Sequence, residues 1–169
     1  GFPGETEEDF RVLCDFVRAA EFDWMGVFAY SDEETAKSYA CDEKVDAETI
    51  ARRRDTLMAI QQKVSRRNLR AKVGKTFTAM LEGPSKDTDI VWEARLEGMA
   101  PEIDGKVFIT EIAGVTDAAQ LPPPGTMARV EITEARDYDL IGRAVEIISA
   151  DTAIPQDTQI LAQPFPILA

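Results

Sequence analysis

Histidine is absent from this chain of 169 residues, and cysteine occurs only twice, at Cys14 and Cys41. Without histidine there is no His-based general acid or base, no Ser-His-Asp or Cys-His arrangement and no His-ligated zinc. The two cysteines lie too far apart in the sequence for a redox or metal-binding knuckle. We expect Cys14 to be a buried small hydrophobe on a helix, and Cys41 to be exposed in a polar loop. Residue chemistry alone therefore indicates a binding module.

Long apolar runs are also missing. No stretch approaches the roughly 20 apolar residues that span a bilayer, and no charged-then-apolar leader precedes the first residues. We expect a cytoplasmic protein without membrane contact.

Positive charge is scarce, because 19 Lys and Arg face 31 Asp and Glu, for a net charge of −12. Nucleic acids are bound chiefly by Lys and Arg side chains that neutralise phosphates, so RNA is the less favoured partner. The same acidic field favours a basic protein partner and speeds encounter with it.

Residues 73–149 show the period of two that is typical of strands with one buried face. The alternating segments are Val73–Glu82, Ile90–Leu96, Val107–Ile112, Met127–Thr133 and Leu140–Ile148. Turn residues separate them, at Gly83-Pro84, Pro101, Gly105, Pro122–Gly125 and Asp137. Five short strands cannot cover both faces of an open sheet, whereas a closed barrel hides its edges. We predict a small OB-like β-barrel here.

The first 45 residues combine a helix with an apolar run. Thr6 is a plausible N-cap with Asp9 three residues later, and an apolar stripe follows at Phe10, Leu13, Cys14, Val17 and Ala20. The run Phe22–Tyr30 is apolar with little alternation, which predicts a strand buried on both faces. A helix followed by such a strand is half of a β-α-β unit, so these residues belong to a larger α/β domain or pack on the barrel.

A second helix is expected from Ala47 to Arg70, capped by Asp46 and striped with Ile50, Leu57, Ile60 and Val64. Its basic runs, at residues 52–54 and 66–67, are typical of a solvated face or of partners for nearby acids. We predict an α+β protein with four parts: a β/α piece at 1–45, a connector helix at 46–71, the barrel at 72–149 and a poorly ordered tail at 150–169.

Three turns are candidates for function. Gly1–Thr6 is a glycine turn that either shapes the chain or lets a ligand approach the backbone. The acidic turns Pro101–Gly105 and Asp137–Asp139 also suit plain turn chemistry. Tyr138 could close the barrel end or present its ring to a partner.

Several segments together resemble the methylthiotransferase family of radical S-adenosylmethionine (SAM) enzymes. They are Gly1–Phe10, Val27–Ser31, Arg54 with Leu57-Met58 and Gln61-Gln62, and Val73–Ile148, which resembles the appended TRAM barrel of that family. Within the barrel, Ala100–Gly105 and Tyr138–Gly142 resemble the branch that modifies a small-subunit ribosomal protein rather than tRNA.

The resemblance implies transfer of a methylthio group to the β-carbon of an aspartate on ribosomal protein S-twelve, using SAM and two 4Fe-4S clusters. By this resemblance, the residues near the SAM adenosine and the inner barrel wall are Gly1, Phe2, Gly4, Glu5, Phe28 and Tyr30. It places toward the protein substrate Glu102, Asp104, Tyr138 and Asp139.

Two features depart from the family pattern. The Cys-x-x-x-Cys-x-x-Cys run is missing, and Cys14 with Cys41 cannot supply the thiolates of a cluster. Thr35-Ala36 stands where the branch usually carries Gly-Thr, which affects the conformation of that loop. We therefore expect the C-terminal part of such an enzyme, with no cofactor bound and no turnover on its own.

Two other readings stay open. The first is a stand-alone RNA-binding module that uses the arginines at 52–54 and 66–67, with Phe77, Trp92 or Phe108 as stacking residues. The second is an inert fragment that self-associates through exposed apolar surface.

Overall fold

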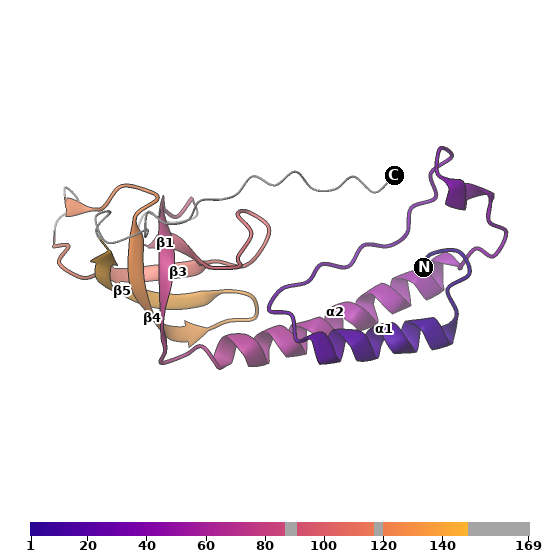
Figure 1. Cartoon of the computed structure of the whole chain (residues 1–169), viewed down its shortest axis with the longest axis horizontal. Coiled ribbons are helices and arrows are strands. Elements are labelled where there is room, and N and C mark those ends of the chain that lie inside the picture. The colour runs from indigo at the N-terminus through magenta and orange to yellow at the C-terminus, as the bar shows by residue number, and fades with distance from the viewer. Residues whose placement is uncertain (87–90, 117–119, 149–169) are drawn as a thin grey trace, which may run out of the picture.

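The computed structural model describes residues 1–86, 91–116 and 120–148 (Figure 1). The helices are α1 (Glu7–Ala20), the 3-10 helix η1 (Lys37–Ala40) and α2 (Ala47–Arg70). The strands are β1 (Thr76–Pro84), β2 (Trp92–Leu96), β3 (Val107–Ile112), β4 (Met127–Ala135) and β5 (Leu140–Ile148). Both predicted helices and all five barrel strands are confirmed. Ile90 and the tail predicted at 150–169 lie outside the described residues.

The five strands form the predicted closed barrel, in the order β1-β2-β3-β5-β4. β3 and β5 pair in parallel, and every other neighbouring pair is antiparallel. Leu69, in the last turn of α2, joins the barrel core, so the helix and the barrel share one apolar interior. The buried strand residues of that core are Ala79, Leu81, Trp92, Ala94, Leu96, Val107, Ile109, Ile112, Ala128, Val130, Ile132, Leu140 and Ala144.

Helices α1 and α2 lie side by side, and the barrel lies beyond the C-terminal end of α2 (Figure 1). The predicted caps are confirmed: Thr6 and Asp9 form a capping box on α1, and the Asp46 side chain accepts a hydrogen bond from the backbone N–H of Thr49 on α2. The core of the helix pair contains Phe10, Cys14, Val17 and Leu57. Leu13, predicted on the same stripe, is instead 40% exposed. None of the described helices combines the length and the apolar content that a membrane span requires.

The strand predicted at Phe22–Tyr30 is wrong, because this segment is irregular chain. No described strand pairs with it, so its peptide groups have no sheet partner within the described residues. Met25 and Val27 pack against the helix-pair core, Trp24 packs against the barrel core, and Phe28 is 94% exposed. The apolar run therefore serves contacts with two neighbouring cores rather than burial inside a sheet.

Candidate functional site

The two acidic turns of the barrel lie next to each other. They precede β3 and β5, which are parallel neighbours, so both turns are at the same end of the barrel. The Lys106 backbone N–H donates to Asp139 Oδ1 at 2.9 Å, and the Leu140 N–H donates to the Lys106 carbonyl at 2.8 Å. A Cβ atom on Gly105 would lie 1.7 Å from the Tyr138 carbonyl oxygen, so only glycine fits there. The structure thus brings together the two turns that carry the predicted partner-binding residues, with Glu102 and Asp104 in the first turn and Tyr138 and Asp139 in the second.

These four residues divide into two kinds. Asp104 Oδ2 accepts from the Ala100 backbone N–H at 2.7 Å, and Asp139 accepts from Lys106, so both carboxylates shape their own turns. Glu102 is exposed, with a left-handed φ of 61°. Tyr138 is 38% exposed and is not part of the barrel core. Of the four, Glu102 and Tyr138 are consequently the side chains exposed to solvent, and Ile103, between Glu102 and Asp104, is 84% exposed.

The β4–β5 turn is tied to the helix pair by polar contacts. Arg66 donates from Nε and an NH2 group to the two carboxylate oxygens of Asp137, each at 2.6 Å. These hydrogen bonds hold the pKa of Asp137 below its ordinary value and raise the pKa of Arg66. Trp24 Nε1 donates to the Tyr138 carbonyl at 3.1 Å. The acidic surface is therefore oriented by α2 and by the segment that follows α1.

The glycine turn brings together three of the six predicted cofactor residues. Gly1, Glu5 and Phe28 line a cavity of about 100 Å³ between α1, α2 and the segment that follows α1. Phe2 and Tyr30 instead contact each other edge to face, with ring centroids 5.5 Å apart. Gly4 has φ +84°, and its N–H donates to the Glu43 carbonyl at 2.8 Å.

Arg53 lines the same cavity and was missed by sequence reasoning. It is 5% exposed, donates to the Glu5 carbonyl at 3.1 Å and lies 2.9 Å from Glu7 Oε1. Its guanidinium stands over the Phe10 ring, 5.4 Å from the centroid. Its buried Nε has no hydrogen-bond partner within the described residues. Arg53 differs from Arg52 and Arg54 only in being buried, and the basic run in the sequence does not show which of its arginines is buried.

The other arginines of the two basic runs pair with acids, as predicted for a run of this kind. The pairs are Arg52 with Glu7, Arg54 with Asp55, Arg66 with Asp137 and Arg67 with Glu21. The RNA-binding alternative required these guanidinium groups to contact phosphates, but each of them is already paired with a carboxylate. That alternative also named three stacking residues; Trp92 is 9% exposed inside the barrel, whereas Phe77 and Phe108 are half-buried.

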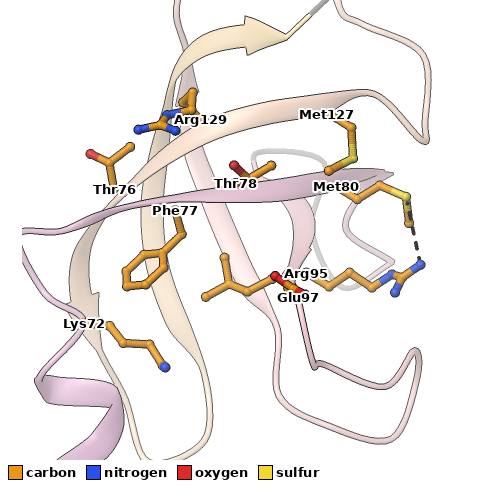
Figure 2. A pocket seen from close by; sticks show the side chains of 10 residues that line it. Lys72, Thr76, Phe77, Thr78, Met80, Arg95, Glu97, Met127 and Arg129 are labelled. Atoms are coloured by element: carbon orange, nitrogen blue, oxygen red, sulfur yellow. Dashed lines mark hydrogen bonds between the residues drawn. The ribbon is translucent and has the colours of Figure 1, made fainter. Parts of the chain in front are cut away.

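A groove of about 690 Å³ lies across β1, β2 and β4 of the barrel (Figure 2). We call it the β1 groove. Sequence reasoning missed it because most of its residues come from three strands that are distant in the sequence. Its lining residues are Lys72, Thr76, Phe77, Thr78, Met80, Arg95, Leu96, Glu97, Met127 and Arg129.

The thiols do not fit an iron–sulfur cluster. Cys14 is buried on α1 and Cys41 is exposed, as predicted. No group of three or more Cys, His, Asp or Glu side chains suited to a metal ion occurs among residues 1–86, 91–116 and 120–148. A 4Fe-4S cluster takes its ligands from several cysteine thiolates, which these residues do not provide.

Comparison with known proteins agrees with this architecture. Residues 73–145 match the model of the TRAM domain. Three relatives carry the name ribosomal protein uS12 methylthiotransferase RimO. The protein from Koribacter versatilis is 54% identical over 85% of this chain and 28% of its own length. Those from Solibacter usitatus and Sorangium cellulosum are 51% and 43% identical, over 84% and 86% of this chain and 30% and 28% of theirs. The chain thus spans less than a third of each relative. It belongs to the radical SAM methylthiotransferase family, in the uS12 (RimO) branch, and its barrel is a TRAM domain.

Proposed function

We propose that this chain is part of an enzyme that adds a methylthio group to an aspartate of ribosomal protein uS12. The observation that carries the proposal is the 54% identity, over 85% of the chain, to a relative of that name. In this proposal residues 1–45 are a piece of a radical SAM β/α barrel, and residues 46–71 connect it to the TRAM barrel at 72–149. The rest of the β/α barrel would cover the apolar side chains exposed by α1, Val12 and Phe16, and by the segment after it, Phe22 and Phe28.

SAM would lie beside the glycine turn, against Gly1, Phe2, Gly4, Glu5, Phe28 and Tyr30. Arg53 supports this, because it lines the cavity together with Gly1 and Glu5, and its buried Nε–H has no hydrogen-bond partner among the described residues and is available as a donor. Ligand pockets commonly measure about 300–1,000 Å³, so a cavity of 100 Å³ forms only one wall of such a site. SAM and two 4Fe-4S clusters supply the radical chemistry when bound, and thiolates outside this chain would hold the clusters.

The TRAM barrel would recognise uS12 as a basic protein through its two acidic turns. Glu102 and Tyr138 would contact the substrate, while Asp104 and Asp139 hold the turns in place through backbone hydrogen bonds. The net charge of −12 supports a basic partner over an acidic one.

Binding of purified uS12 to the chain, measured by calorimetry, tests this proposal. We expect measurable affinity that falls as salt rises, because the contact is between opposite charges. Glu102→Lys should weaken binding by about tenfold, since like charges then meet at the contact. Glu111→Lys is the matched control, because Glu111 is an exposed acid of the same barrel on β3. Absence of uS12 binding, or equal losses in the two variants, would refute the role of the acidic turns.

A further inference from the structure

We propose that Trp24 is a positioning residue, which holds the helix pair and the barrel in one fixed orientation. The inference rests on the proposed function, because these two parts would carry the SAM wall and the substrate surface of one enzyme. Trp24 is half-buried and packs against the barrel core, although it belongs to the irregular segment that follows α1. It lines neither the cavity at the glycine turn nor the β1 groove.

Trp24 meets the barrel at the place where the two acidic turns adjoin. Its Nε1–H donates to the Tyr138 carbonyl at 3.1 Å, and Nε1 lies 3.0 Å from the position that a Cβ atom on Gly105 would occupy. One indole ring therefore touches both turns, and its directional hydrogen bond fixes the angle of contact. The neighbouring Asp23 adds an ion pair at 3.0 Å to Lys72, a residue of the β1 groove.

The segment that carries Trp24 is itself fixed to α2. The backbone carbonyls of residues 21–23 each accept a hydrogen bond from an α2 side chain. In chain order the donors are Asn68 at 2.7 Å, Gln61 at 2.6 Å and Ser65 at 2.7 Å. Gln61 and Ser65 are buried, and positions 61, 65 and 68 share one face of the helix. Movement of the segment would leave two buried side chains without their carbonyl acceptors, so the segment and α2 behave as one body.

The other contacts between the two parts resist rotation less well. Leu69 enters the barrel core from the last turn of α2, and Figure 1 shows the barrel beyond that end of the helix. A body held at the end of one helix can still turn about the helix axis. The Arg66–Asp137 ion pair is about half exposed on both sides, and pairs of this kind contribute little. Trp24 comes from a segment that packs on the side of α2, so its contact lies off the axis and opposes rotation.

In the proposed function, this orientation decides the rate of transfer rather than the affinity for uS12. Phe28, four residues after Trp24, lines the cavity at the glycine turn, whereas Trp24 touches the acidic turns. A displacement of about 1 Å between reacting groups can lower a rate by about 100-fold. Loss of the Trp24 contact should therefore leave the surface that binds uS12 intact and slow the chemical step.

Residual dipolar couplings of the full chain test the orientation directly. The helix pair and the barrel strands of the parent should share one alignment tensor. Trp24→Ala should give the two parts different tensors, and Trp24→Phe, which keeps a ring but loses the N–H donor, should give a smaller difference. Trp92→Phe is the matched control, because it removes the other indole of the chain, inside the barrel core, and should keep one tensor.

One shared tensor in Trp24→Ala, separate tensors in the parent, or separate tensors in Trp92→Phe would overturn the proposal. If Trp24→Ala does not fold, Trp24→Phe decides in the same way. Kinetics of the complete enzyme supply the second readout. Trp24→Phe should lower kcat about tenfold or more while KM for uS12 stays within about twofold, because positioning is lost but no substrate contact is. Equal losses in kcat and in uS12 affinity would contradict a positioning role. Failure of the parent chain to bind uS12 would count against the proposed function, whereas the couplings would still decide whether Trp24 sets the orientation.

Discussion

Replacing Gly105 by alanine should separate the two acidic turns. Gly105 does not have a positive φ, so an alanine there suffers no backbone strain and the effect is steric. Its Cβ would lie 1.7 Å from the Tyr138 carbonyl oxygen, and real Cβ contacts are not shorter than 3.0 Å. The turns must therefore move apart by at least the difference, 1.3 Å. A shift of this size breaks the two hydrogen bonds between the turns, which are 2.9 and 2.8 Å long.

Two lost hydrogen bonds cost about 1–3 kcal/mol of unfolding free energy. For a domain the size of the barrel (72–149), each kcal/mol of lost unfolding free energy lowers the melting temperature by about 4–8 °C. Circular dichroism melts of Gly105→Ala and the parent chain measure this, with Gly26→Ala as control, because a Cβ there meets only Phe28 at 3.6 Å. In the proposed function the same variant also loses uS12 affinity, because the turns that carry Glu102 and Tyr138 are no longer held together. A melting temperature and uS12 affinity equal to those of the parent would refute the adjacency of the turns.

Two further predictions concern titratable groups. The pKa of Asp137 is lowered by Arg66, so this pair stabilises the protein above the ordinary aspartate value of 3.8, and the contribution is lost as pH falls through the lowered pKa. The melting temperatures of Asp137→Asn and the parent should therefore differ near neutral pH and converge in acid; a constant difference would contradict the coupling. Burial raises the pKa of Cys14, so its thiol should react with a disulfide reagent only on unfolding, whereas exposed Cys41 should react at once. Rapid reaction of both thiols in the native protein would show that Cys14 is not buried.

The barrel was predictable because its signal is local. Alternation in each strand places Ala79 and Leu81 inside and Thr78 and Met80 outside, and the structure follows that pattern. Helix ends were equally predictable, since a cap such as Asp46 forms its hydrogen bond within three residues. Closure then follows from the need to hide strand edges.

The predictions fail where the sequence shows that a segment is buried but not which part of the protein it packs against. The run Phe22–Tyr30 is apolar because Trp24 packs on the barrel core while Met25 and Val27 pack on the helix core. A continuous apolar run cannot distinguish these contacts from a strand within a sheet, since hydropathy carries no information about hydrogen-bond partners. Arg53 was missed for a related reason, because only tertiary packing buries it while Arg52 and Arg54 stay exposed.

Contacts between the segment after α1 and the barrel link the two parts of this chain. The Lys72–Asp23 ion pair, like the Trp24 hydrogen bond to the Tyr138 carbonyl, joins the segment after α1 to the barrel region. That segment also carries Phe28 to the cavity at the glycine turn. A short, continuous stretch of chain thus touches both the proposed SAM wall and the proposed substrate surface. In a methylthiotransferase the substrate aspartate must reach the cofactor, so the orientation of the TRAM barrel decides which side chain arrives there. In the proposed function, the determinants of substrate choice would therefore include the hydrogen bonds of Trp24 and Asp137 as well as the side chains of the acidic turns.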